Sequence, residues 1–201
     1  MIRNIVFDIG NVLAAFRWKE YIAELGFDDE TSGRLAKATT LSPLWREIDR
    51  AVMPLNDIIE ACIKSDPGIE REIRLFFKDR RRLVMEYDYS KSWLEELKSR
   101  GYGIYLLSNY SPDHFQYVSR QFSFFGLEDG MLISFEVKLL KPDRRIYEAL
   151  FDRYGLIPGE CVFLDDSPEN IEGAVKAGMQ GIVFENYAQG RRELEKLINQ
   201  G

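Results

Sequence analysis

The chain has 201 residues, 33 of them acidic and 27 basic, and its net charge of −6 opposes binding to nucleic acid. Hydrophobic residues make up 45% and charged residues 30%, as in an ordinary globular domain, and no apolar run reaches the roughly 20 residues of a membrane-spanning helix. The first strand-like run begins close to Met1 without a signal-peptide pattern, so we expect a cytoplasmic protein with neither a nucleic-acid nor a membrane partner.

The chain opens with an apolar strand over residues 4–7, after which the sequence changes character. Residues 16–87 show helical periodicity punctuated by prolines and no strand-like run, with Val84 placed in the last helix. We therefore expect a core over 1–15 and 88–201 and a wholly helical insert between them. An insert directly after the first strand lies above the carboxyl edge of the sheet, where a lid or specificity cap belongs.

After the insert, strand and helix patterns alternate regularly. Further strands are expected over 103–107, 131–134, 161–164 and 181–184, and helices over 92–99, 112–121, 143–154, 168–177 and 191–199. Asp143 and Ser167 are placed to cap the helices that follow them. This alternation predicts an α/β fold, a doubly wound, Rossmann-like parallel sheet of about five strands with helices on both faces.

Two further features have structural interpretations. The basic cluster over 78–82 is typical of a solvated helix face rather than of a binding patch. Cys62 and Cys161 lie far apart in apolar patterns, so we expect reduced, structural cysteines rather than a disulfide or a metal cluster.

Asp8 ends the first apolar strand and is followed by a glycine-containing turn. In a parallel α/β sheet this position is the carboxyl edge, where ligands bind. A carboxylate there can attack phosphorus and form an aspartyl phosphate that water later hydrolyses. The turn amides after Asp8 can hold phosphate oxygens, since Gly10 allows close backbone approach. Taken alone, the motif is equally consistent with an acid that caps a turn.

Two later segments supply groups that bind phosphate. Ser108 and Asn109 follow the strand over 103–107, and their hydroxyl and amide groups can donate to a phosphoryl oxygen. Lys141 lies at the entry to a capped helix, where its ammonium can neutralise a phosphate and the charge of the nucleophile. Lys138 is a nearby competitor for that role.

Asp165 and Asp166 end another apolar strand, and Asn170 follows shortly after them. Adjacent carboxylates repel one another unless a cation neutralises them, and hard oxygen ligands suit Mg²⁺. The strands that end in Asp8 and in Asp165 can be neighbours at the switch point of a doubly wound sheet. Asp8, its turn carbonyl and Asp166 can then share one Mg²⁺ that faces a phosphoryl group.

In their order along the chain, these four segments resemble the haloacid dehalogenase superfamily, with the insert at the position of that family's helical cap. The segments Phe-Asp-Ile-Gly-Asn-Val, Leu-Leu-Ser-Asn, Lys-Pro-Asp-Arg-Arg-Ile-Tyr and Asp-Asp-Ser-Pro-Glu-Asn-Ile-Glu-Gly-Ala are similar to its bacterial α-D-glucose-1-phosphate phosphatase branch. The resemblance implies Asp8 as the nucleophile. The other residues that it implies are Ser108 and Lys141 for the phosphoryl group, Gly10 and Asp166 beside Asp8 for the metal, and Asp165 and Asn170 in support.

Position 10 departs from the pattern of that superfamily. Most of its phosphatases carry a second aspartate two residues after the nucleophile, a general acid and then base, whereas this chain has Gly10. Losing a positioned proton donor costs roughly 10²–10⁴-fold where the leaving group needs one. Three explanations stay open: another residue such as His114 substitutes, the leaving group departs easily, as a sugar hemiacetal oxygen does, or the protein only binds a phosphorylated ligand. Because the similar branch also has glycine here, we favour an easy leaving group, and we read His114 as a surface helix residue.

We therefore predict a Mg²⁺-dependent phosphatase for a small phosphorylated metabolite such as a sugar phosphate. One alternative is a non-catalytic protein that binds a phosphorylated ligand, for which Gly10 is the support. Another is carbon–halogen hydrolysis by Asp8, against which the pair of metal-binding acids counts, and a phosphomutase would want the missing acid. Candidate substrate contacts in the insert, unless they form its own core, are Phe16, Trp18, Trp45 and Arg46.

Overall fold

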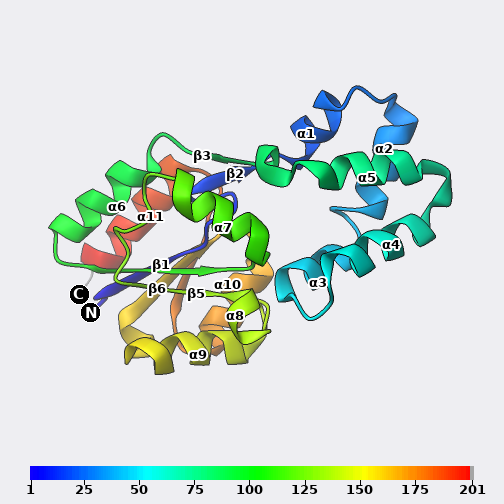
Figure 1. Ribbon diagram of the computed structural model, residues 1–201. Helices are drawn as coiled ribbons and strands as arrows, with labels where there is room; N and C mark the ends of the chain where they lie inside the picture. The colour runs from blue at the N-terminus through cyan, green and yellow to red at the C-terminus, as the bar shows by residue number, and fades with distance from the viewer. Residues whose placement is uncertain (200–201) are drawn as a thin grey trace.

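The computed structural model of the protein describes residues 1–199, and a five-stranded parallel sheet lies at its centre (Figure 1). The strands are β1 (Asn4–Phe7), β4 (Gly103–Ser108), β5 (Gly130–Ile133), β6 (Cys161–Asp165) and β7 (Gln180–Val183), in the order β5-β4-β1-β6-β7. The chain builds outward from β1 to β4 and β5, then crosses back to β6 and β7 on the other side. Strand β1 therefore lies at the switch point of the sheet, and the predicted doubly wound fold is confirmed.

Helices cover both faces of this sheet because successive side chains of its strands point to opposite sides. On one face lie α6 (Ser90–Ser99), α7 (Pro112–Gln121) and α11 (Tyr187–Asn199), and on the other lie α9 (Arg144–Tyr154) and α10 (Pro168–Lys176). Ile5 and Phe7 of β1 are buried in the first layer and Val6 in the second. As predicted, Asp143 and Ser167 cap α9 and α10 through their side-chain oxygens.

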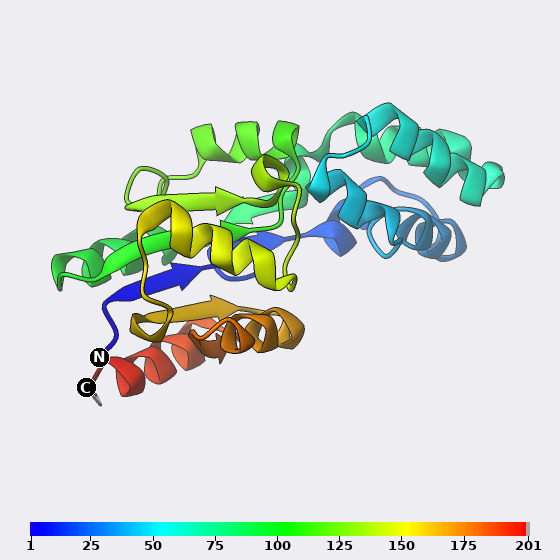
Figure 2. The same ribbon diagram turned by 90° about the horizontal axis from the view of Figure 1, so that it is seen from below.

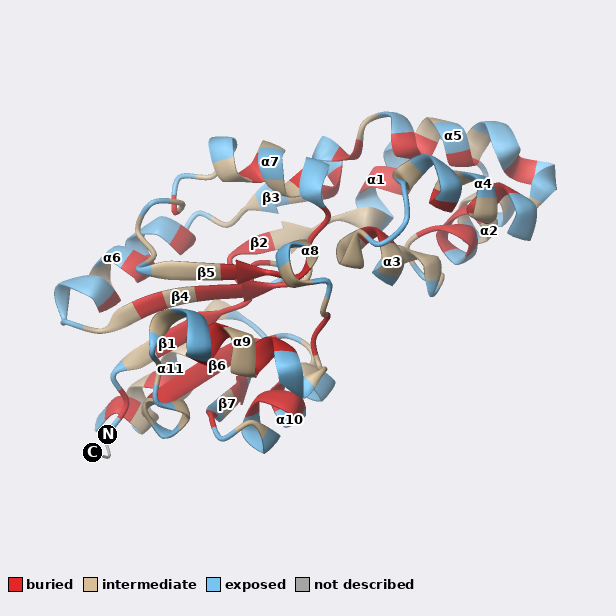
Figure 3. Cartoon of the chain, turned by 60° about the horizontal axis from the view of Figure 1, so that its bottom comes forward, coloured by how far each residue is buried: buried red, intermediate tan, exposed pale blue. Residues whose placement is uncertain are grey.

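The five α-helices between Phe16 and Val84 pack around a hydrophobic cluster of their own, which includes Leu35, Ile58 and Phe76. These helices, hereafter the cap, are α1 (Trp18–Glu24), α2 (Asp29–Ala38), α3 (Leu44–Arg50), α4 (Leu55–Ser65) and α5 (Glu70–Lys78). The arrowheads of the central strands point toward the cap (Figure 2). Buried residues form one band through the sheet and a second within the cap (Figure 3).

The expectation that residues 16–87 are wholly helical is wrong at the base of the cap. The outgoing chain forms β2 (Ala14–Phe16) and the returning chain forms β3 (Val84–Glu86), and the two pair antiparallel. Helix α5 ends at Lys78, so Val84 lies in a strand opposite Phe16 instead of in the last helix. The pairing satisfies the backbone polar groups of the two segments that connect the core to the cap.

The basic cluster over 78–82 also differs from its interpretation as a solvated helix face. Residues Arg80–Leu83 form a short 3₁₀ helix, and the Arg80 side chain is buried against α7. Its guanidinium donates to Ser111 Oγ and pairs with Asp113, which joins the end of the cap to the core. Burial is tolerated here because the charge has an acidic partner.

The remaining predicted elements match the structure apart from their ends, with one addition. Strand β5 ends at Ile133, and Ser134 begins a short helix, α8 (Ser134–Val137). Both cysteines are buried and free, as expected. Among residues 1–199, the helices are too short or too polar for any of them to traverse a bilayer.

Candidate active site

Asp8 lies at the carboxyl edge of the sheet because it directly follows β1, and its N–H donates to the Leu164 carbonyl of β6 at 2.9 Å. Its carboxylate oxygen Oδ1 accepts from Ser108 Oγ at 2.6 Å and from the Ile9 amide at 2.7 Å, and it lies 2.9 Å from Lys141 Nζ. No hydrogen bond from residues 1–199 reaches the second oxygen, Oδ2. The contacts thus orient the carboxylate and leave one oxygen able to attack an incoming atom.

Burial sets the protonation behaviour of Asp8, which is only 7% exposed. Loss of hydration raises the pKa of Asp8 to about 7, and the nearby Asp165 adds to this effect, while Lys141 and the Ser108 hydroxyl oppose it. A cation bound beside Asp8 would favour the ionised form that nucleophilic attack requires.

Lys141 forms a buried ion pair with Asp165, and both side chains are almost completely excluded from solvent. Lys141 Nζ lies 2.6 Å from Asp165 Oδ2, and Asp165 also accepts from Asn170 Nδ2 and from the Ser167 amide. Burial opposes the charge of Lys141, but Asp165 and Asp8 outweigh it, so the pKa of Lys141 is raised. The ammonium is therefore charged and fixed beside Asp8.

Asn109 holds the backbone of Lys141 from both sides. Its Oδ1 accepts from the Lys141 N–H at 2.9 Å, and its Nδ2 donates to the Lys141 carbonyl at 3.3 Å. We expected this amide to donate to phosphate, whereas here its amide group is engaged in positioning the lysine. Lys138, the competitor for the role of Lys141, is exposed and donates to the Ala51 carbonyl of the cap.

Three carboxylates converge at this edge of the sheet. Asp8, Asp165 and Asp166 each offer an oxygen, and these atoms lie within 4.8 Å of one another. Asp165 is already engaged by Lys141 and Asn170, whereas the Asp166 side chain accepts from Asn11 Nδ2 at 2.8 Å and has no other side-chain partner within residues 1–199. Asp166 therefore has lone pairs available beside Asp8, and Asp165 does not.

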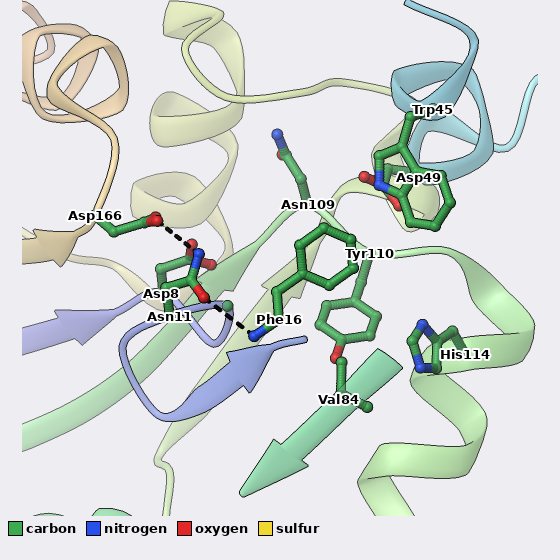
Figure 4. A pocket seen from close by; sticks show the side chains of 11 residues that line it. Asp8, Asn11, Phe16, Trp45, Asp49, Val84, Asn109, Tyr110, His114 and Asp166 are labelled. Carbon is green, nitrogen blue, oxygen red and sulfur yellow. Dashed lines mark hydrogen bonds between the residues drawn. The ribbon is translucent and has the colours of Figure 1, made fainter. Parts of the chain in front are cut away.

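The turn after Asp8 completes this donor set. Within residues 1–199 no hydrogen bond reaches the Gly10 carbonyl, which lies on the turn next to the acids. Asn11 adopts a left-handed φ of 55°, which asparagine tolerates, and its Oδ1 accepts from the Phe16 amide while its Nδ2 reaches Asp166 (Figure 4). Carboxylate and carbonyl oxygens of this kind fit a hard divalent cation such as Mg²⁺.

A pocket of about 160 Å³ lies between these acids and the cap. Figure 4 shows Asp8, Asn11 and Asp166 on its core side, with Trp45 and Asp49 reaching in from helix α3. Phe16 and Trp45, whose ring centres are 5.6 Å apart, form an apolar wall. Other lining residues are Gly10, Val84, Asn109, Tyr110 and His114.

The candidate contacts from the insert divide into two groups. Phe16 and Trp45 line the pocket, and Trp45 also packs on Phe76 of the cap, so it serves both lid and core. Trp18 packs in the hydrophobic cluster of the cap, and Arg46 lines a separate cationic pocket beside α3. Neither lines the pocket that contains Asp8.

The interpretation of His114 as a surface residue is wrong, since its side chain is 6% exposed and lines the pocket. Burial, together with the neighbouring Arg80 charge, lowers the pKa of His114 to about 4, so the ring is neutral at pH 7. Two buried polar atoms on this side of the pocket, His114 Nε2 and the Tyr110 hydroxyl, have no hydrogen-bond partner within residues 1–199. Both atoms are excluded from solvent and stay unsatisfied in the buried wall behind the pocket.

Asp49, Tyr110 and Asn11 were not singled out from the sequence. Asn11 lies within the glycine-containing turn, and Tyr110 directly follows the Ser108-Asn109 pair. The sequence therefore placed both residues near the site but did not indicate what they do there. Asp49 lies in a cap helix, and nothing in its local sequence distinguishes it from a surface acid.

The fold and this site together define a hydrolase class. A sequence model of the family described as haloacid dehalogenase-like hydrolase matches residues 2–178, and the chain belongs to this family.

Known proteins resemble the chain over most of its length. The sesquiterpene phosphatase astK of Aspergillus oryzae is 25% identical over 194 residues, which cover 96% of this chain and 95% of the relative. The (S)-2-haloacid dehalogenase 4A of Burkholderia cepacia is 28% identical over 162 residues, 73% of this chain and 70% of the relative. A HAD family enzyme of Bacteroides thetaiotaomicron, solved with magnesium and inorganic phosphate, superimposes with a TM-score of 0.70 at 21% identity, covering 94% of this chain and 98% of that one. That structure shares the fold of this protein.

Proposed function

We propose that this protein is a Mg²⁺-dependent phosphatase that hydrolyses a small phosphomonoester through an aspartyl phosphate on Asp8. The observation that carries the proposal is the arrangement around Asp8: one carboxylate oxygen is held by Ser108 and Lys141, and the other is left to attack. The phosphatase activity of the astK relative and the magnesium and phosphate bound by the Bacteroides enzyme give independent support.

In this reaction Asp8 attacks phosphorus in line with the leaving oxygen, and water later attacks the aspartyl phosphate. The charged Lys141 stabilises the negative charge that develops on the phosphoryl oxygens, because it is fixed in a site with little water. Ser108 donates to Asp8 before attack and can donate to the phosphoryl group afterwards. Asp165 and Asn109 hold Lys141 in place, so neither needs to contact the substrate.

Asp8, Asp166 and the Gly10 carbonyl would hold the Mg²⁺, which supplies charge neutralisation between the acids and the phosphate. Asp165 plays a supporting role, because its oxygens are engaged by Lys141, Asn170 and the Ser167 amide.

The pocket is suited to a small substrate with polar substituents. Phe16 and Trp45 offer apolar contacts, and the polar side chains of Asn109 and Asp49 also line the pocket. A sugar phosphate meets both requirements. The motifs shared with the bacterial α-D-glucose-1-phosphate phosphatase branch support the same choice, and we include that substrate in the proposal.

Carbon–halogen hydrolysis is the second candidate, because the Burkholderia relative is a haloacid dehalogenase. A dehalogenase has no need for metal-binding acids, whereas Asp166 is held by Asn11 beside Asp8 with oxygens available to a metal ion. This arrangement favours the phosphatase.

The test is phosphate release from a panel of sugar phosphates with Mg²⁺ or with EDTA, alongside chloride release from 2-chloropropionate. We expect phosphate release that requires Mg²⁺ and is abolished by Asp8→Asn, and no chloride release. Asp152→Asn, on the exposed face of α9, is the matched control and should behave as the parent. Equal release by parent and Asp8→Asn, or chloride release alone, would refute the assignment.

A further inference from the structure

The proposed reaction needs a proton donor for any leaving group that is a poor anion, and position 10 does not supply one. Gly10 lines the pocket, and a Cβ built on it would meet no heavy atom within 4 Å. The space that an acidic side chain would take at this position is therefore open. The donor, if the pocket contains one, must come from another element.

Asp49 lies on the opposite wall, on cap helix α3, and lines the same pocket as Asp8 (Figure 4). The residue as a whole is half-buried, its carboxylate is desolvated, and the carboxylate forms no hydrogen bond or ion pair within residues 1–199. A carboxylate without a partner in a ligand pocket is costly to bury, so a functional role is the usual explanation. Asp49 therefore meets the first requirement for a proton donor, which is access to the bound ligand.

The backbone around Asp49 is fixed to the core and does not depend on the cap alone. Ser134 Oγ donates to the Asp49 carbonyl at 2.6 Å and accepts from the Tyr110 amide at 3.0 Å. Lys138 Nζ donates to the Ala51 carbonyl at 2.9 Å, two residues further along. These bonds join the end of α3 to α8 and to the segment after β4, so they fix the position of Asp49 relative to the core.

The environment of Asp49 also keeps a proton available. Burial raises the pKa of Asp49 to about 7, with Arg80, Lys141 and Arg46 opposing the shift and Asp8 adding to it. A carboxyl group of this acidity exists in both protonation states near neutral pH, as a group that first gives and then takes a proton must.

The other titratable groups of the pocket are less suited. His114 is neutral at pH 7, because burial lowers its pKa to about 4, so it cannot act as an imidazolium acid. Burial raises the pKa of the Tyr110 hydroxyl well above its ordinary value, so it is a weak acid and cannot act as a base toward water. Asp8 and Asp166 are engaged as nucleophile and metal ligand in the proposed function.

We propose that Asp49 is the general acid and base of the phosphatase reaction, supplied by the cap in place of a core residue at position 10. This inference rests on the proposed function. In the first step Asp8 Oδ2 forms a bond to phosphorus, the ester P–O bond breaks, and the Asp49 carboxyl gives its proton to the leaving oxygen. In the second step the Asp49 carboxylate takes a proton from the attacking water, the water oxygen bonds to phosphorus, and the Asp8–phosphorus bond breaks. Free enzyme, alcohol and phosphate result.

The test uses two classes of substrate that differ in their need for the acid. An alkyl phosphate such as glycerol 3-phosphate must protonate its leaving oxygen, whereas p-nitrophenyl phosphate releases a stable phenolate. For Asp49→Asn, kcat/KM on the alkyl phosphate should fall by roughly 10²–10⁴-fold and on the aryl phosphate by less than about tenfold. In rapid mixing with the aryl phosphate, the variant should release one equivalent of nitrophenolate per enzyme in a burst, because the step that needs the base is now slow.

Asp57→Asn, an exposed acid on neighbouring helix α4, is the matched control and should behave as the parent on both substrates. Mg²⁺ affinity measured by calorimetry should be the same in Asp49→Asn and the parent, which shows that the site has folded. Equal losses on both substrates without a burst, or a change confined to KM, would overturn the role of Asp49. Failure of the proposed function gives a different result, in which the parent releases nothing from either substrate.

Discussion

Lys141 Nζ lies 2.6 Å from Asp165 Oδ2, and this pair is buried directly behind the nucleophile. The next residue in the chain, Asp166, instead points into the pocket and bonds to Asn11. The two adjacent aspartates therefore have different roles. Asp165 holds the Lys141 ammonium, whereas Asp166 is available to bind a metal ion. Their substitution should affect different properties.

Asp165→Asn should destabilise the protein, because it leaves the buried Lys141 with one carboxylate partner fewer. We expect its free energy of unfolding to fall by about 3–5 kcal/mol, as when one partner of a buried ion pair is removed. Asp166→Asn should change the stability of the metal-free protein by less than about 1 kcal/mol but abolish Mg²⁺ binding. Urea unfolding and calorimetric Mg²⁺ titration of both variants check this, and reversed effects would exchange the two roles.

His114 should make the stability of the protein depend on pH in a defined window. The folded protein holds it with a pKa of about 4, against 6.5 for an ordinary histidine, because the ring is buried near Arg80. Between pH 6.5 and 4 the unfolded chain binds more protons, so the free energy of unfolding falls as the pH is lowered through this range. The loss reaches up to about 3 kcal/mol below pH 4.

His114→Gln lacks this protonation, so the comparison of parent and variant isolates it from the other acids. The parent should lose about 3 kcal/mol relative to His114→Gln between pH 7 and pH 4, measured by urea unfolding at fixed ionic strength. A difference in stability that does not change with pH would show that the ring is solvated in the folded protein.

The core part of the site could be predicted because its residues follow strand ends. Asp8, Ser108 and Asp165 each terminate or follow a buried apolar run, and parallel strands bring such positions to one edge of the sheet. The order of the motifs along the chain was therefore enough to place them together. The five central strands were predictable for the same reason, since each is a short apolar run between helical patterns.

The cap side of the site depends on packing that has no periodic signal in the sequence. Asp49 and Trp45 reach the pocket because Ser134, at the end of β5, bonds to the backbone of α3. His114 is buried on α7, and this helix is held to Arg80 through Ser111 and Asp113, a link that the sequence pattern does not reveal. Strand β3 was missed since three residues are too few to show alternation and exist as a strand only through pairing with β2.

Ser134→Ala should loosen the cap without touching the catalytic groups. The substitution removes a donor to the partly buried Asp49 carbonyl and an acceptor for the buried Tyr110 amide. We expect a loss of about 1–3 kcal/mol in stability and a fall in kcat/KM of roughly tenfold or more, because Asp49 is no longer held. Ser99→Ala removes a similar hydrogen bond, to the Glu96 carbonyl, at the exposed end of α6 and is the matched control. Equal activity of the two variants would show that the cap is positioned by other contacts.

Gly10→Asp tests whether an acid on the core can take over from the acid on the cap. The backbone at Gly10 is not left-handed, and the new side chain enters open space, so the fold should tolerate it. The added carboxylate lies near Asp8 and Asp166, so repulsion should lower the melting temperature in EDTA, and Mg²⁺ should restore most of the loss. In the double variant with Asp49→Asn, hydrolysis of glycerol 3-phosphate should recover at least tenfold over Asp49→Asn alone.

Gly10→Asp in the parent should add little activity, because Asp49 already supplies the proton. Recovery in the double variant together with this small gain would mean that the two positions supply the same proton. A gain of equal size in both backgrounds would instead mean that Asp49 and the new acid act independently, which contradicts a single shared role.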